Sequence, residues 1–347
     1  MSARKRVTIK QVAQAAGVST QTVSRVINDR PDVAPETRKR VKDIIAQLGY
    51  QPSNVARSLS QGRSCTLGVV GTGLQYFGPS QTLVGVVDQS NELGYRLLLN
   101  VMHHPASNNV QQLLQDMHSQ HVDGIVWAVP EIGSNREWVA RQAPEFTVPM
   151  VFLSMEPVAG LSTCSVDNHS GGHMATQHLL DQGYRDVGFI TGPLDWWEAR
   201  QRRVGWQAAL TRAGLTADEN LVVEGNWSPT SGEHGLRKLL EQRPSLEAVF
   251  VSNDQMALGV IKATREMGLR VPEDLAIVGF DDIPEAAYFC PPLTTVRQDM
   301  AELGSCAVKE LERLIRASGE TPIEPQTVSL QPQLIVRQSS IVADSVS

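Results

Sequence analysis

The sequence predicts an all-α helix-turn-helix head followed by an α/β core of two lobes with parallel sheets. The first 50 residues contain three short segments of helical periodicity, with Gly17 after the first and Gly49 after the third. From Cys65 onward, short apolar runs alternate with longer helical stretches, and this rhythm occurs twice in succession. A chain of 347 residues exceeds one compact core, so a small module joined to a larger body is expected.

Charge divides the chain in the same way. Residues 1–63 hold 12 Lys and Arg against four Asp and Glu, a net charge of +8, whereas the rest carries −14. A basic head on an acidic body favours a nucleic-acid partner for the head, although the overall charge of −6 does not. An ordinary solvated basic helical face is the alternative.

The predicted head has three helices. The first runs from Thr8, its expected cap, to Ala16 and is ended by Gly17; the second covers 20–28 with Ser19 or Thr20 as its cap; the third covers 35–48. Their apolar residues recur at helical spacing and would form a small common core. These residues are Ile9, Val12, Ala13, Ala16, Val23, Val26, Ile27, Val41, Ile44, Ile45 and Leu48.

Two short helices around a glycine turn are typical of a helix-turn-helix, whose second helix enters the major groove of DNA. Thr20, Gln21 and Arg25 would then face base edges, because Gln can bond adenine and Arg can bond guanine. A second set of polar residues is expected to contact phosphates: Ser19, Thr22, Ser24 and Asn28. A purely structural three-helix bundle is the alternative, which the basic charge disfavours.

The predicted core contains two α/β repeats, which implies parallel sheets. In the first, strands at 66–70, 97–101 and 124–127 alternate with helices at 81–93 and 110–119. In the second, strands at 187–190, 248–252 and 276–280 alternate with helices at 169–182, 199–213 and 256–267. A closing strand is predicted over 330–336. Ligands of such sheets bind at the carboxyl ends of strands, so the residues there are site candidates.

Enzyme and cofactor motifs are missing from the sequence. Gly71-Thr72-Gly73 follows a strand, but Tyr76 occupies the third glycine position of a dinucleotide-binding turn. No Walker loop, H-E-x-x-H or G-x-S-x-G occurs, so we expect neither an enzyme nor a cofactor. Four cysteines without a C-x-x-C pair suggest reduced core thiols and no metal site: Cys65, Cys164, Cys290 and Cys306. Without a signal peptide or an 18-residue apolar stretch, we expect a cytoplasmic protein that contacts no membrane.

The strand ends of the second repeat suit a neutral polyol. Asn253 and Asp281 can each hold adjacent hydroxyl groups, and Arg202 adds a fork of donors. Trp227, with Trp196 or Trp197, offers flat faces for a sugar ring. Asp254 and Asp282 stand beside them, but we expect these two to cap the following helices instead.

The motif T-I-x-x-V-A-x-x-A-G-V-S-x-x-T-V-S-R-V-I-N, followed by L-G-Y-x-P, resembles the head of the LacI/GalR family of sugar-responsive repressors. The resemblance implies a hinge helix over 51–62 that folds when two copies pack on operator DNA. It adds four expected DNA contacts: Thr8, Asn54, Ala56 and Leu59. Leu59 would be a wedge in the minor groove, although it can also be read as a packing residue of a linker.

The resemblance extends over nearly the whole chain, through blocks such as T-G-P-L at 191–194 and N-D-Q-M-A-L-G at 253–259. It implies a periplasmic-binding-protein-like core with six sugar contacts that keep the family pattern: Pro79, Arg202, Trp227, Asn253, Asp281 and Gln298. Other pocket positions depart from that pattern: Ser154, Trp196, Trp197, Ala128 and Met300. The lost acid and amide and the added indoles favour a different or larger glycoside.

We therefore expect a repressor of a carbohydrate-utilisation operon, released from a pseudo-palindromic double-stranded operator by a galactoside or other disaccharide or glycoside. The expected domains are a head over 1–50, the hinge, a core over 63–340 and a flexible tail over 341–347. Within the core, lobe 1 would comprise 63–163 and 292–322, and lobe 2 would comprise 164–291 and 323–340.

The tail lacks heptads, so a homodimer rather than a tetramer is expected, with Val84, Val87 and Leu98 as interface candidates. Two alternatives concern the ligand. A sugar-binding transport receptor would share the core, but it would not carry a DNA-reading head. A purine-sensing or corepressed member of the family would bind its operator more tightly with ligand.

Overall fold

The computed structural model describes residues 7–27, 29–50, 63–102, 110–132, 135–143, 146–317 and 324–341. The chain forms two compact units, Met1–Cys65 and Thr66–Ser347. The predicted hinge and most of the tail lie outside the described residues. So do four expected DNA contacts: Asn28, Asn54, Ala56 and Leu59.

The first unit contains the three predicted helices, α1 (Ile9–Ala16), α2 (Thr20–Ile27) and α3 (Pro35–Leu48). Gly17 and Gly49 end α1 and α3 in the left-handed conformation, with φ of 63° and 61°, which glycine adopts without steric cost. Their small core is built from Val12, Ala13, Ala16, Val23, Val26, Val33, Val41 and Tyr50. Leu48 was expected in this core but is 37% exposed.

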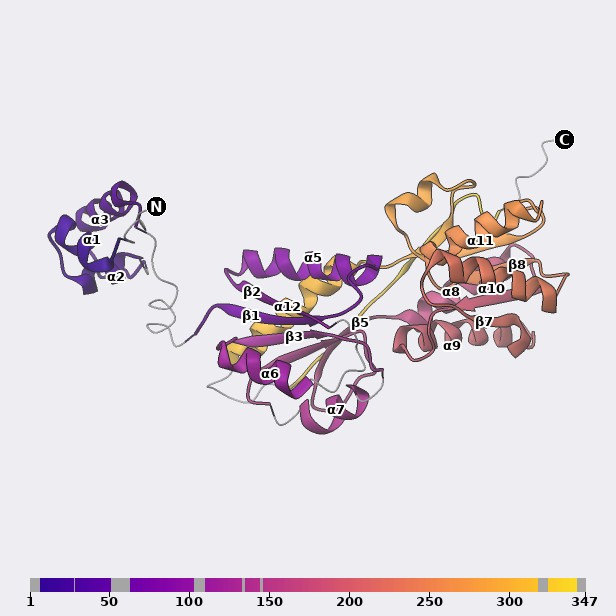
Figure 1. The fold of residues 1–347 in the computed structure, drawn as a ribbon, viewed down its shortest axis with the longest axis horizontal. Coiled ribbons are helices and arrows are strands. Elements are labelled where there is room, and N and C mark those ends of the chain that lie inside the picture. The colour runs from indigo at the N-terminus through magenta and orange to yellow at the C-terminus, as the bar shows by residue number, and fades with distance from the viewer. Residues whose placement is uncertain are drawn as a thin grey trace, which may run out of the picture. The chain divides into compact units, whose positions relative to one another are not determined.

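Lobe 1 of the second unit is built on a six-stranded sheet in the order β11-β5-β4-β3-β1-β2. Helices α5 and α12 cover one face and α6 and α7 the other (Figure 1). All its strand pairs are parallel, as predicted. The strands are β1 (Thr66–Gly71), β2 (Arg96–Val101), β3 (Gly124–Ala128), β4 (Met150–Leu153), β5 (Ser162–Val166) and β11 (Thr327–Leu330). The helices are α5 (Phe77–Glu92), α6 (Val110–Ser119), α7 (Asn135–Gln142) and α12 (Met300–Ala317).

Lobe 2 repeats this plan with the order β12-β10-β9-β8-β6-β7, in which only the β10–β12 pair is antiparallel among the described strands. Helices pack in two pairs, α8 with α9 and α10 with α11. The strands are β6 (Val187–Thr191), β7 (Val222–Glu224), β8 (Ala248–Val251), β9 (Ala276–Asp281), β10 (Thr294–Arg297) and β12 (Gln333–Ile335). The helices are α8 (Asn168–Asp181), α9 (Trp197–Arg212), α10 (Pro229–Gln242) and α11 (Asp254–Glu266), with short 3-10 turns at Glu219–Leu221 and Pro284–Tyr288.

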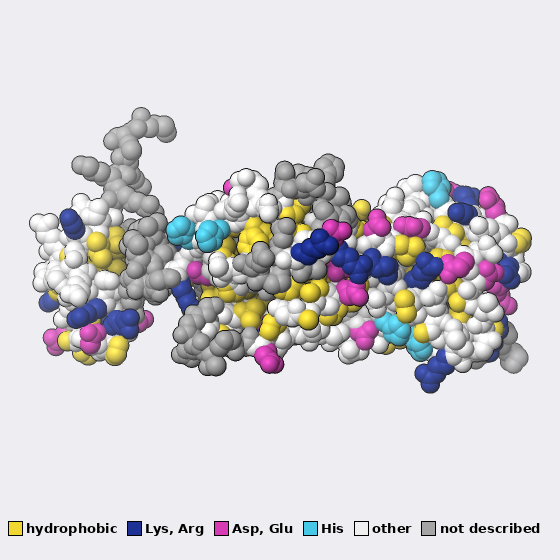
Figure 2. Space-filling view, turned by 90° about the horizontal axis from the view of Figure 1, so that it is seen from below, with side chains coloured by type: hydrophobic (Ala, Val, Ile, Leu, Met, Phe, Trp, Pro, Cys, Tyr) yellow, Lys and Arg dark blue, Asp and Glu magenta, His cyan; other side chains and the backbone are white. Residues whose placement is uncertain are grey.

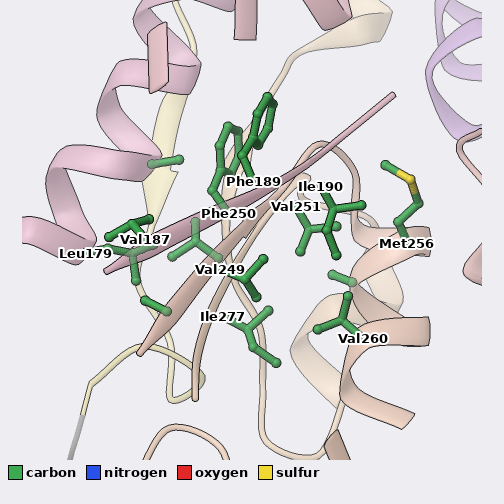
Figure 3. Close-up of a cluster of buried hydrophobic side chains, with 14 of the residues drawn as sticks. Leu179, Val187, Phe189, Ile190, Val249, Phe250, Val251, Met256, Val260 and Ile277 are labelled. Carbon is green, nitrogen blue, oxygen red and sulfur yellow. The ribbon is translucent and has the colours of Figure 1, made fainter. Parts of the chain in front are cut away.

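The core of lobe 2 is a continuous layer of buried apolar side chains between its sheet and helices (Figure 3). Phe189 and Phe250 stack on neighbouring strands with ring centroids 4.8 Å apart, and Trp206 of α9 stacks on Phe189 at 5.9 Å. The indole Nε1 of Trp206 donates to the carbonyl of Val187 at 3.2 Å, so this large ring is buried without an unpaired polar atom. Lobe 2 therefore gives its strand ends a rigid support.

The chain crosses between the lobes three times, after β5, β10 and β11, and the predicted boundaries are wrong by a few residues at each crossing. Strand β5 belongs to lobe 1, and β10 pairs with β9 in lobe 2. The predicted closing strand over 330–336 is two strands in different sheets, β11 and β12. Each crossing follows the end of a strand because a strand must complete its hydrogen-bonded ladder before the chain can leave the sheet.

Surface features test several smaller expectations. Basic and acidic side chains are intermingled over the core (Figure 2). No disulfide joins the four cysteines, all of which lie among the described residues. Cys164 alone among them is buried, while Cys290 is exposed. Val84 and Val87 of α5 are 45% and 36% exposed, whereas Leu98 faces the lobe 1 core, and Leu99 of the same edge strand is exposed instead. No helix in the described part of the chain is long and apolar enough to cross a membrane.

Candidate functional site

A cavity lies between the two lobes at the carboxyl ends of their strands. The space inside the cavity that is open to the centre of a water-sized sphere measures about 100 Å³. Eight of the nine predicted sugar contacts line it: Pro79, Ser154, Trp196, Arg202, Trp227, Asn253, Asp281 and Gln298. Ala128 and Met300, the other two positions that depart from the family pattern, line it too. Trp197, the first residue of α9, is not among the lining residues.

Arg202 is the central cation of this cavity. It reaches from α9, where its Nε donates to Asn168 Oδ1 at 2.7 Å and its Nη1 donates to the carbonyl of Ser252. Its guanidinium carbon lies 3.8 Å from the ring centroid of Phe280 and 5.6 Å from that of Trp227. Burial lowers the pKa of Arg202, and Asp281 opposes this shift. Because its side chain is held both by the first residue of α8 and by Ser252 directly after β8, Arg202 supports the fold as well as lining the cavity.

Asn253 and Trp227 are fixed to one another. Asn253 caps α11 by accepting from the Met256 amide at 2.8 Å, and its Nδ2 donates to the carbonyl of Trp227 at 3.1 Å. The ring of Trp227 occupies the place of a side chain at Gly192, where a Cβ would come within 2.1 Å of it. Trp196 meets Trp227 edge to face, with centroids 5.8 Å apart. Two indoles thus form a rigid corner of the cavity.

Asp281, at the end of β9, accepts from Gln298 Nε2 at 2.7 Å. Burial raises the pKa of Asp281 to about 6, against the lowering effects of Arg202 and of the Gln298 hydrogen bond. The backbone of Asp281 has φ of 112°, which is strained for a residue other than glycine. This buried carboxyl, amide and guanidinium together form a polar clamp of the type that holds neighbouring hydroxyl groups.

The expectation that Asp254 and Asp282 cap helices is wrong. Asn253 caps α11, and Asp254 instead accepts from the Ile283 amide at 2.9 Å and from Thr295 Oγ1 at 2.6 Å. Burial holds the pKa of Asp254 well above its usual value. Asp282 pairs with Arg297 and Arg337. Both carboxyls brace the loop after β9, because each ties it to residues distant in the sequence.

Several lining residues were not predicted. Thr72 and Tyr76 follow β1, so the strand-end rule could have found them. Phe77 begins α5 in lobe 1 and packs, together with Tyr76, against the core of lobe 2. Glu198 lies in the first turn of α9, where an acid is ordinarily explained by the helix dipole and therefore gave no signal.

An ion pair also joins the lobes beside the cavity. Arg200 Nη2 of α9 lies 3.3 Å from Glu131 Oε2 in the loop after β3. Glu131 accepts in addition from the amide of Glu156 at 3.0 Å, while Arg200 Nη1 donates to the carbonyl of Asp195 at 2.8 Å. Burial raises the pKa of Glu131, an effect opposed by Arg136 and Arg200. The pair links elements that would move apart if the lobes opened.

The second candidate surface is the exposed side of α2. Thr20, Gln21 and Arg25 are all exposed, and Gln21 and Arg25 share a face because they are four residues apart. Arg25 makes a loose pair with Asp32 at 3.4 Å, in which both side chains are about half exposed. Ser19 caps the helix, with its Oγ 3.0 Å from the Thr22 amide and 2.9 Å from Thr22 Oγ1. Thr8 is exposed at the start of α1, where its amide donates to Gln11.

Comparison with known proteins supports both parts. Residues 8–53 match the family described as bacterial regulatory proteins, lacI family, and residues 176–340 match the periplasmic binding protein-like domain. The HTH-type transcriptional repressor PurR of Haemophilus influenzae strain PittEE is 37% identical over 337 residues, covering 96% of this chain and 98% of PurR. PurR of Erwinia tasmaniensis is 38% identical over 344 residues, covering 97% of each chain.

Solved structures match over the same length. The lac repressor dimer bound to operator and the anti-inducer ONPF has a TM-score of 0.85 and 30% identity, covering 97% of this chain and 100% of that one. A complex of the transcriptional regulator CelR with cellobiose has a TM-score of 0.72 and 33% identity, covering 96% and 100%. Identity over the whole chain is higher to these PurR proteins than to the lac repressor. The chain belongs to the LacI family, as a DNA-binding transcriptional repressor with an effector-binding core and not as an enzyme.

Proposed function

We propose that this repressor controls a carbohydrate-utilisation operon and is released from its operator by a sugar, either a galactoside or another disaccharide or glycoside. The observation that carries this proposal is the cavity's pairing of a buried polar clamp with an indole corner. Arg202, Asp281, Asn253 and Gln298 offer donors and acceptors to neighbouring hydroxyl groups, while Trp196 and Trp227 offer apolar faces to a ring. The similarity to a regulator solved with cellobiose supports the same ligand class.

The size of the cavity indicates how such a ligand would bind. We propose that the cavity, with about 100 Å³ in which a water-sized sphere can be centred, holds one sugar ring between the lobes. A second ring or aglycone would therefore extend toward the mouth of the cavity. Trp196, at the start of α9, is the expected partner for this outer group.

The proposed mechanism couples the cavity to the head. Sugar would draw the lobes together, shift paired copies of lobe 1 and separate the hinge segments, so that Leu59 no longer grips the minor groove. This requires the sugar to bind the low-affinity form more tightly than the operator-bound form, because a ligand shifts an equilibrium only by its differential affinity. We propose a homodimer that acts in the cytoplasm, with Val84 and Val87 at its interface.

A thermal-shift panel of mono- and disaccharides tests the ligand, and the hits are then added to the repressor bound to a selected pseudo-palindromic duplex. We expect at least one disaccharide or glycoside to raise the melting temperature and to weaken operator binding by tenfold or more, read by fluorescence anisotropy. If no sugar binds, or if those that bind leave operator affinity unchanged, the proposal fails.

A purine corepressor is the second candidate, favoured by the 37% identity to PurR. The indole corner would also accept a planar base, and Arg202 and Asp281 could bond its edge. The direction of the effect separates the two candidates. Hypoxanthine and guanine in the same assay would tighten operator binding if the second candidate is correct, whereas a sugar inducer loosens it.

A further inference from the structure

We propose that Glu198 is a ligand-binding residue whose carboxylate accepts a hydrogen bond from an effector hydroxyl and destabilises the unliganded protein. The inference rests on the proposed function for the chemistry of the donor. It goes beyond the proposed function by identifying a further residue that carries specificity for the effector. In the described part of the chain, no helix-capping hydrogen bond and no ion pair accounts for the burial of the Glu198 carboxyl.

The geometry places the Glu198 carboxyl where a ligand would meet it. The residue lies in the first turn of α9, two positions after Trp196, and lines the cavity between the lobes. Its Oε2 is buried and has no hydrogen-bond partner in the described part of the chain. Ser154 of lobe 1 is near enough to the carboxyl to lower its pKa. The carboxyl therefore has accepting capacity that the protein leaves unused.

An unused acceptor of this kind has an energetic cost, because burying a carboxylate removes its hydration and nothing replaces it. Burial raises the pKa of Glu198 to about 7, and Glu131 raises it further, while its own helix amide, Arg202 and Ser154 lower it. Glu131 faces the group from the loop after β3 but is itself paired with Arg200. The groups around Glu198 thus offset only part of the cost of burying its charge. A hydrogen bond from an effector hydroxyl would offset the rest.

The cost has a defined dependence on pH. Folding raises the pKa of this carboxyl from 4.5 to about 7. The carboxyl therefore does not lower the free energy of unfolding at a pH well below 4.5. Its destabilising effect builds up between pH 4.5 and about 7 and is complete above that. Unliganded protein should therefore lose stability between pH 5 and pH 8 because of Glu198. A carboxyl in a purely supporting role, with its bonds made, would show the opposite dependence.

The first experiment measures the melting temperature of the unliganded full chain at pH 5 and pH 8. We expect Glu198→Gln to raise it by about 5 °C at pH 8 and to leave it unchanged at pH 5, because the amide removes the charge but keeps the shape. Glu241→Gln, at an exposed position on α10, is the matched control and should change neither value. If Glu198→Gln lowers the melting temperature at both pH values, the inference is wrong.

The second experiment measures effector affinity by calorimetry, using cellobiose or, if it does not bind, the strongest binder from the sugar panel. Glu198→Gln should weaken binding about tenfold at pH 8, because a charged acceptor is replaced by a neutral one. Wild-type affinity should fall as the pH is lowered from 8 to 6, and the variant should keep only the weaker dependence due to Asp281.

The two experiments test different parts of the proposal, so each can contradict its own part. Unchanged affinity and pH dependence in Glu198→Gln would show that the carboxyl does not contact the sugar. A panel in which no sugar binds would overturn the proposed function and the hydroxyl donor with it. Even then, the melting temperatures at pH 5 and pH 8 decide whether Glu198 destabilises the unliganded protein.

Discussion

The head and the effector cavity place their functional residues in opposite environments. On α2, the expected base contacts Thr20, Gln21 and Arg25 are exposed, and a separate set of buried valines holds the helix in place. In the cavity, Arg202 and Asn253 are buried and also hold α8, β8 and α11 together. Function and stability are therefore separable by residue in the head but not in the cavity.

This difference follows from the ligands. Base edges lie in an open groove and are reached by side chains that extend from a rigid helix. A small polar molecule must be surrounded, so its contacts are taken from the interior and need hydrogen bonds of their own. Substitutions at the two sites should consequently differ in which property they change.

The largest effect is expected for Arg202→Met. The change leaves Asn168 Oδ1 and the Ser252 carbonyl without their donor and removes the buried positive charge near Asp281. The free energy of unfolding should therefore fall by about 3–5 kcal/mol, and the sugar response should be lost. Chemical denaturation measures the first and operator release the second. Arg212→Met, exposed on the same helix, should change stability by less than about 0.5 kcal/mol. A wild-type denaturation midpoint for Arg202→Met would contradict the dual role.

Gln21→Ala and Arg25→Ala should each weaken operator binding by about 1–3 kcal/mol, because each removes contacts to a base edge. Stability should not change measurably, since the Arg25–Asp32 pair is exposed and contributes little. Anisotropy titrations and thermal melts of the same samples check both statements. A clear loss of stability in either variant would mean that the head does not separate the two properties.

Ser19→Ala tests a residue of the head at which we expect DNA binding and stability to depend on the same side chain. Loss of its bond to the Thr22 amide should cost about 1 kcal/mol of stability in the first unit. Ser19 is also a predicted phosphate contact, so DNA affinity should fall uniformly across sequences. Gln14→Ala, exposed on α1, is the control. Unaltered melting of the Ser19 variant would assign the residue to DNA contact alone.

The smallest effect is expected for Arg200→Gln, which breaks the ion pair between the lobes. Arg200 is about one third exposed, so stability should fall by only about 0.5 kcal/mol. If the pair favours the closed lobes, sugar affinity should fall about threefold in calorimetric titrations. A variant that binds sugar as tightly as wild type would show that Glu131 and Arg200 only stabilise the neighbouring loop.

The sequence predicted the fold class and half of the residues that line the cavity. The fold class and the strand-end residues depend on patterns that repeat along the chain, whereas Pro79, Ser154 and Gln298 were implied by the family resemblance. Helical periodicity located α1, α2 and α3, and the strand-end rule pointed to Asn253 and Asp281. It failed for features fixed by distant contacts. Asp254 was expected to cap a helix, but its partners Ile283 and Thr295 lie on another loop and strand. Trp197 looked equivalent to Trp196, yet only Trp196 is among the lining residues, and α9 begins between the two.

The three crossings between lobes affect how the chain can be made. The first sheet is completed by β11, whose residues 327–330 come near the end of the chain and pair with β5. During synthesis, lobe 1 therefore exposes an unpaired edge at β5 until almost all of the protein has left the ribosome. A truncation before residue 327 would leave that edge open permanently, so shortened products should aggregate and should not yield an isolated lobe.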